Sequence, residues 1–353
     1  MFKYNWCQSA AGLFVLLASG VAWTVEYELA EGFPEAAAGA YGIEIDALGD
    51  GRLVVWNGET VYVQSLPGGN RFVAVGTGYV GDPGFMAVSP DGHTLLLGAG
   101  YSGKLYWFDA DNPSDYTPES VAATAGHYSG VFLTETLVLL DKTADDFSTC
   151  ELAIIDLSSP APAAKTVMRK PSAGDVPAGG FAASAQLAVN SGRTTVYAMS
   201  VVYDEMYTVV ASQLKSISAS ALIGAYNADE TLDWDTDAAA IGEPMEYNSG
   251  GPAGVMGDGT VVIGGFGGIQ LLDASTGAIE ETLMPAGFDY YGVACNTHTG
   301  DIYAIVADPL DWSMDVVYAP LGALTPLPGL SIAGLVVLTG ALAAAGVIGR
   351  RRA

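Results

Sequence analysis

The sequence predicts an all-β protein, specifically a β-propeller of six or seven blades, and three observations predict it. The 353-residue chain combines 45 Gly with 18 Tyr and 6 Trp while only 15% of its residues are charged, a composition typical of compact β structure. Short apolar runs alternate with Gly, Asn-Gly and Asp-Gly turns through the body of the chain, as they do between antiparallel strands. These runs also recur at a regular interval, which indicates a repeat architecture.

The clearest repeat unit lies between residues 85 and 109. It comprises a predicted strand at 85–89, a Pro-Asp-Gly turn, a strand at 94–98, a Gly-rich turn and a strand at 104–109. Six copies of this unit are visible, with their turn positions at 51, 92, 135, 192, 259 and 300. Three of the five spacings are 41 to 43 residues, which is the length of a four-stranded propeller blade.

The two longer spacings, 57 and 67 residues, indicate inserts. We expect a surface loop at 160–180 and, within 215–240, a short helix at 217–225. A seventh blade could form from a strand at 23–29 with the tail of the last repeat, or lie within 193–258. Strands from both termini would close the ring and remove its open edges. A pair of β-sandwiches is the alternative, but it leaves the 41-residue interval unexplained.

The N-terminal segment 1–22 is typical of a secretory signal peptide. Lys3 precedes an apolar run at 10–21, and small residues stand at Gly20 and Ala22. We expect cleavage after Ala22, with an uncleaved anchor as the alternative. The propeller is then expected to occupy residues 23–324.

The C-terminal segment 325–353 has three parts. The first is a Pro-containing motif formed by Pro326, Leu327 and Pro328. The second is an uncharged stretch at 329–349, which as a transmembrane helix would span about 31 Å, enough for a bilayer core. The third is a cluster of three basic residues that would hold this end in the cytoplasm, Arg350, Arg351 and Arg352.

This order of motif, span and arginines resembles the C-terminal sorting signals of exported bacterial proteins, the PEP-CTERM/exosortase kind. The resemblance covers 29 residues, and it departs from the family pattern because Leu327 stands where a Pro-Glu-Pro motif has Glu. It implies a temporary anchor in the bacterial inner membrane, removed by a sorting protease or transpeptidase of the exosortase type. A permanent single-span anchor is the alternative.

The body of the chain resembles a second group of proteins. The segment from Val88 to Ala110 is similar to the blades of secreted WD-like and lactonase-like β-propellers, and the similarity of turns and spacing extends over most of 25–324. Residues 23–349 carry 39 acidic and nine basic residues, a net charge of −30. Such a body repels anionic surfaces, so nucleic acid is excluded as a partner.

Two acidic patterns are candidates for metal binding, the first of them for Ca²⁺. The first offers oxygen ligands at alternate positions of a loop, and its residues are Asp109, Asp111 and Asp115. The second alternates along a predicted strand, which would place three carboxylates on one face, and its residues are Asp233, Asp235 and Asp237. A solvated turn and the wet face of an outer strand are the respective alternatives.

No catalytic residue is assigned. The chain has no Gly-x-Ser-x-Gly elbow and no phosphate-binding loop, and its histidines (His93, His127 and His298) lack a two-His metal spacing. A metal on the propeller axis would require two or more of four side chains to converge from different repeats, namely His127, His298, Glu44 and Asp289. Cys150 and Cys295 lie three repeats apart, so we expect two buried, unpaired thiols.

The sequence therefore predicts an exported, acidic bacterial propeller of the cell surface or extracellular matrix. Its predicted role is non-enzymatic, either structural or the binding of an unidentified surface ligand. One alternative is a secreted propeller hydrolase, lactonase or lyase with a metal on the axis. The other is an envelope scaffold tethered permanently to the membrane.

Overall fold

The computed structural model describes a compact unit that spans Glu26–Ala323. Its described residues are 28–29, 32–35, 43–77, 83–100, 102–110, 126–143, 150–170, 176–245, 251–264, 269–284, 290–296, 298–307 and 314–320. Ala22, the motif at 326–328, the span at 329–349 and the arginines at 350–352 lie outside them. No helix among the described residues is long and apolar enough to cross a membrane.

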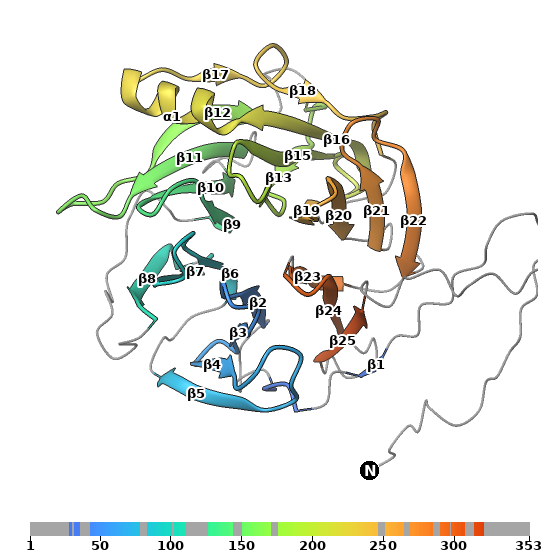
Figure 1. Cartoon of the computed structure of the whole chain (residues 1–353). Coiled ribbons are helices and arrows are strands. Elements are labelled where there is room, and N and C mark those ends of the chain that lie inside the picture. Colours follow the sequence, from blue (N-terminus) through green and yellow to red (C-terminus); the bar gives the residue numbers. More distant parts are fainter. Residues whose placement is uncertain are drawn as a thin grey trace, which may run out of the picture. The chain divides into compact units, whose positions relative to one another are not determined.

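The described strands form six sheets around a common centre, as Figure 1 shows. We number these sheets as blades 1 to 6 in chain order. Blade 1 contains β2 (Glu44–Ala47), β3 (Leu53–Trp56), β4 (Thr60–Gln64) and β5 (Phe72–Thr77). Blade 2 contains β6 (Pro83–Val88), β7 (Thr94–Ala99) and β8 (Lys104–Asp109). Blade 3 contains β9 (His127–Phe132), β10 (Leu137–Thr143), β11 (Cys150–Asp156), β12 (Lys165–Lys170) and β17 (Leu232–Asp233).

The second half of the ring follows the same plan. Blade 4 contains β13 (Phe181–Ala183), β14 (Ala188–Val189), β15 (Thr195–Tyr203), β16 (Val209–Ser218) and β18 (Ala239–Ala240). Blade 5 contains β19 (Gly251–Val255), β20 (Thr260–Gly264), β21 (Ile269–Asp273) and β22 (Ile279–Met284). Blade 6 contains β23 (Tyr290–Asn296), β24 (Asp301–Ala307), β25 (Met314–Pro320) and β1 (Glu28–Leu29). The prediction of an all-β propeller is therefore confirmed, and each repeat seen in the sequence corresponds to one sheet.

The N-terminal strand closes the ring. In blade 6, β1 pairs antiparallel with β25, with Glu28 opposite Tyr318 and Leu29 opposite Val317. The first strand thus joins the last sheet, where it stands outermost, instead of starting a seventh blade. The inner strands β2 and β23 lie side by side, so blades 1 and 6 meet as the other neighbours do.

The turns between the first two long strands of each blade follow the sequence pattern. The predicted turn residues Gly51, Gly92, Gly259 and Gly300 have φ values of 75° to 94°, a conformation that glycine adopts without strain. In blade 4 the left-handed residue is Arg193, with φ of 49°, and not the neighbouring Gly192. That shift by one residue places a basic side chain where the other turns have none.

The hydrophobic core lies between adjacent sheets. Trp56 of blade 1 packs with Val88 and Leu97 of blade 2 in one cluster, and similar clusters join blades 2 and 3, 3 and 4, 4 and 5, and 6 and 1. At about 25 cal/mol per Å² of buried apolar surface, these interfaces supply the main stabilisation of the ring.

Both predicted inserts contain regular structure. The stretch at 160–180, expected to be a surface loop, contains β12, the fourth strand of blade 3; its Pro and Ala residues concealed a short strand with a buried Val167 and Met168. The second insert contains the only helix of the described residues, α1 (Ala219–Ala228). After α1, β17 pairs in parallel with β12 of blade 3, and β18 pairs antiparallel with β16 of blade 4. The insert therefore connects two blades at their outer edges (Figure 1).

A candidate binding site on the propeller axis

A pocket of about 620 Å³ lies at the centre of the ring and is lined by residues of all six blades. Its walls are the inner strands, each of which is the edge of its sheet and so presents backbone groups with no partner strand on that side. Glycines stand in several walls, and at Gly84, Gly130 and Gly254 an added Cβ would meet a neighbouring atom at 2.4 to 2.7 Å, so the inner strands pack closely there. This volume is sufficient for a small organic ligand.

Two carboxyl groups enter the pocket from β2. Glu44 and Asp46 are two residues apart on one strand, so they share a face. Asp46 is anchored, because its two oxygens accept the backbone N–H groups of Ala47 at 2.7 Å and Val88 at 2.8 Å. Burial raises the pKa of Asp46 to about 6 despite these hydrogen bonds. Asp46 therefore ties blade 1 to blade 2 and carries a negative charge at neutral pH.

Glu44 differs from Asp46 in having no hydrogen bond or ion pair with any described residue. It stands directly opposite Trp56 in the β2–β3 pair, and the indole of Trp56 is fully buried. Burial, and to a smaller extent the charge of Asp46, raises the pKa of Glu44 to about 8. Glu44 is therefore mostly protonated at neutral pH and is available to a ligand.

Arg193 is the basic residue among those that line the pocket. Its Nη1 donates a hydrogen bond to the backbone carbonyl of Phe132 in blade 3. Burial lowers its pKa, while the nearby charges of Asp46 and Glu135 raise it. The guanidinium group thus links blade 4 to blade 3 and lies in the electrostatic field of Asp46 and Glu135.

The histidines do not converge. His127 is fully buried, its ring lies edge-on to Phe85 with centroids 5.3 Å apart, and its pKa is lowered to about 3 by burial and then by Lys142. His127 was the strongest sequence candidate for a pocket histidine, but it faces blade 2; its neighbour Tyr128 lines the pocket instead. His298 lines the pocket and is exposed, and His93 is exposed on the β6–β7 turn.

The predicted acidic metal sites are not assembled in the described residues. Asp109 ends β8 and is exposed, whereas Asp111, Asp115 and Asp289 lie outside the described residues. Within the described part of the chain, no three His, Cys, Asp or Glu side chains are grouped so that they could hold a metal ion.

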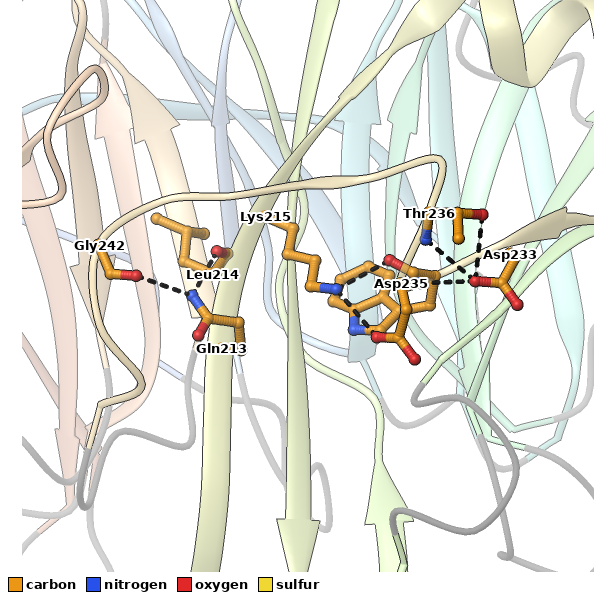
Figure 2. A network of polar contacts seen from close by, with 8 residues as sticks. Gln213, Leu214, Lys215, Asp233, Asp235, Thr236 and Gly242 are labelled. Atoms are coloured by element: carbon orange, nitrogen blue, oxygen red, sulfur yellow. Dashed lines mark hydrogen bonds and ion pairs between the residues drawn. The ribbon is translucent and has the colours of Figure 1, made fainter.

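The predicted strand with three aspartates on one face is wrong, because the chain turns there (Figure 2). The Asp233 carboxylate accepts the backbone N–H groups of Asp235 at 2.8 Å and Thr236 at 3.0 Å, which is how aspartate initiates a turn. Asp237 accepts the N–H of Asp233 at 2.8 Å, and Asp235 pairs with Lys215 at 3.2 Å. The three carboxylates stabilise this turn and hold the insert to blade 4.

The cysteines are free, as expected. Cys150 is buried in blade 3, and Cys295 in blade 6 lines the pocket with partial exposure. Burial raises the pKa of Cys295 to about 12, so its thiol is not a nucleophile at neutral pH.

Sequence reasoning named Glu44 only as a possible metal ligand and did not name Asp46 or Arg193. Alternation along β2 would have placed both acids on one face. The contribution of Arg193 follows from the left-handed turn of blade 4, which no sequence signal marked.

Comparison with known proteins agrees with this architecture. No protein-family model matches the chain, and no curated protein sequence matches it significantly. Among solved structures, the chain is similar to a luciferin-regenerating enzyme (TM-score 0.53, 11% identity, covering 84% of this chain and 94% of that one). It is also similar to a gluconolactonase from Xanthomonas campestris (TM-score 0.51, 11% identity, covering 84% of this chain and 89% of that one). A third similar structure is the hydrazine synthase of Kuenenia stuttgartiensis (TM-score 0.50, 12% identity, covering 77% of this chain and 82% of that one). At such identities the likeness establishes the fold alone.

Proposed function

We propose that this chain is an exported β-propeller of the cell surface that binds a small ligand in its axial pocket without transforming it. The observation that carries the proposal is the pocket itself, which combines about 620 Å³ of space with Glu44, a carboxyl group that no described residue satisfies. Glu44 lines the pocket and is half-buried, so its carboxyl group is open to a ligand that enters the pocket.

A pocket-filling variant tests ligand binding. Gly49 lines the pocket, and a side chain added there would meet nothing within 4 Å of its first carbon, so Gly49→Trp is expected to fold. Wild-type and Gly49→Trp proteins would be immobilised, exposed to small molecules extracted from the host, washed and analysed by mass spectrometry. Molecules retained by the wild type and lost from the variant support the proposal. Identical retention by both proteins would contradict it.

The export part of the proposal rests on the two ends of the sequence. Signal-peptide cleavage after Ala22 and a sorting signal at 325–353 would deliver the propeller to the envelope or beyond, with a membrane anchor that is removed by an exosortase-type enzyme. The intact mass of the protein from its host, with both termini sequenced, tests this. A chain running from about Trp23 to about Pro328 supports sorting. A chain that still ends in Arg352 and Ala353 would instead make it a tethered propeller.

A propeller hydrolase is the second candidate, and the raised pKa of Glu44 favours it. A carboxyl with a pKa of about 8 is suited to general acid–base catalysis near neutral pH, and the three similar structures named above are enzymes by name. The described residues do not fit a Ca²⁺ site, because Glu44 and Asp46 are the carboxylates that line the pocket and Asp46 already accepts two backbone N–H groups. Hydrolysis of an ester and lactone panel that disappears in Glu44→Gln would favour this candidate over simple binding.

A further inference from the structure

The charges around the axial pocket leave one group uncompensated. Asp46 is held by two backbone N–H groups and lies in the field of Arg193. Arg193 in turn is near Asp46 and Glu135 and donates to a backbone carbonyl. Glu44 has only the repulsive charge of Asp46 beside it. Among the described residues, then, the counter-charge for an ionised Glu44 is missing.

Resting on the proposed axial binding site, we propose that its ligand is a small organic cation whose ammonium group lies against the Glu44 carboxylate. An ammonium group supplies the missing positive charge with a single contact, whereas a divalent metal requires several oxygen ligands at once. No grouping of three metal-binding side chains exists in the described part of the chain. An anionic ligand would meet two carboxyl groups and is disfavoured by charge.

The uncharged part of the wall suits the same ligand. Four aromatic residues are among those that line the pocket. Phe85, Phe132 and Tyr303 are at most 5% exposed and pack in clusters between blades, whereas Tyr128 is partly exposed. Aromatic faces attract ammonium and alkylammonium groups, most strongly where water is excluded. A pocket that presents the Glu44 carboxylate and the partly exposed Tyr128 therefore favours a cation over an uncharged molecule of the same shape.

Binding should be linked to the release of a proton. Without ligand, Glu44 is mostly protonated at neutral pH, because burial raises its pKa to about 8. A cation favours the ionised form, so affinity rises with pH, by up to about tenfold per unit, until the pH passes that pKa. The other charged or titratable groups of the lining are Asp46 from β2, Tyr128 from blade 3, Arg193 from blade 4, and Cys295, His298 and Tyr303 from blade 6. Of these, Asp46, whose pKa burial raises to about 6, adds a second dependence at lower pH.

The test compares two ligands of nearly equal shape on the full-length protein by titration calorimetry. The first is choline, whose charge does not depend on pH. The second is its carbon isostere, in which a quaternary carbon replaces the nitrogen. We expect choline to bind the wild type at least about tenfold more tightly than the isostere at about pH 8, and to bind more weakly at about pH 6. Buffers of different ionisation enthalpy should reveal that choline binding releases nearly one proton at about pH 6 and about half a proton at about pH 8.

Variants test whether Glu44 is the group that gives choline its higher affinity and its pH dependence. Glu44→Gln should bind choline no better than the isostere and should lose the pH dependence. Glu59→Gln, which makes the same change on an exposed turn of the same blade, should behave as the wild type. The wild-type proton release needs no variant, so the inference stays testable if Glu44→Gln folds poorly.

Three results would overturn the inference, and they separate it from the proposed function. Choline that does not bind the wild type, equal affinities for choline and isostere, or undiminished choline binding by Glu44→Gln each exclude a cation at Glu44. If molecules are nevertheless retained by the wild type and lost from Gly49→Trp, the pocket remains a binding site for another class of ligand. If that retention also fails, both the inference and the proposed function fall.

Discussion

Lys170→Met should destabilise the protein more than any surface substitution, because Lys170 and Asp141 form a fully buried ion pair. The Lys170 Nζ lies 2.5 Å from Asp141 Oδ2, and both side chains have 0% exposure. Nζ also donates to the backbone carbonyl of Met199 in blade 4, and the same Oδ2 accepts the N–H of Ala185 at 3.1 Å. The pair therefore joins blade 3 to blade 4.

The magnitude follows from what the substitution leaves behind. Removing one partner of a buried pair typically costs about 3–5 kcal/mol, because the remaining charge is buried without compensation. Asp141 Oδ1 already lacks a hydrogen-bond partner among the described residues, and burial already raises the Asp141 pKa. In the variant Asp141 is expected to fold in its protonated form, so the loss should be smaller at low pH and grow as pH rises.

Urea unfolding followed by tryptophan fluorescence measures this loss as a fall in the midpoint at constant slope. Lys142→Met is the matched control, because Lys142 forms a partly exposed pair with Glu151 at 3.7 Å whose loss should cost under about 1 kcal/mol. Lys170→Met combined with Asp141→Leu should recover most of the stability. Equal, small losses in Lys170→Met and Lys142→Met would refute this account of the blade 3–blade 4 interface.

Three further predictions concern the pocket, a packing contact within blade 2 and the insert. Glu44→Gln should flatten the pH dependence of stability. The raised pKa of Glu44 contributes to the free energy of unfolding in full below its ordinary pKa of 4.5, and this contribution is lost as pH rises through about 8. A free energy of unfolding that changes equally in both proteins between about pH 5 and about pH 9 would contradict this. Gly98→Ala should cost about 1–3 kcal/mol, since the new carbon would lie 2.1 Å from the ring of Phe85, whereas Gly257→Ala has open space and should be near neutral; equal melting temperatures would count against tight packing there. Lys215→Met removes hydrogen bonds at 2.8 Å and 3.2 Å to the insert and should speed proteolysis within 219–245 at a cost of about 1–3 kcal/mol; an unchanged cleavage pattern would show that the insert is held elsewhere.

The architecture could be predicted from the sequence because local turn chemistry encodes it. Positive-φ glycines at 51, 92, 259 and 300 mark the turns, and apolar strands separated by those turns leave little choice of fold. The fourth strand of blade 3 escaped prediction, since Lys165–Lys170 follows a Pro- and Ala-rich stretch. Strand identity there comes from pairing with β11, a contact that sequence pattern does not reveal.

The site was less predictable, because it depends on which residues of distant strands meet. Asp233, Asp235 and Asp237 have the alternation of a strand face, but the side chain of Asp233 competes for the backbone and makes a turn. His127 begins an inner strand as expected, yet the alternation of β9 directs it into the interface with blade 2. The isolation of Glu44 results from the partners taken by Asp46 and Arg193, which only the folded ring brings together.

A crystal structure of the protein with the small molecule that the wild type retains would test the central claim most directly. The account predicts ligand density inside the axial pocket, against β2 and within contact of the Glu44 carboxyl. Density on the outer surface of the blades, with an empty axis in the same crystal, would contradict it.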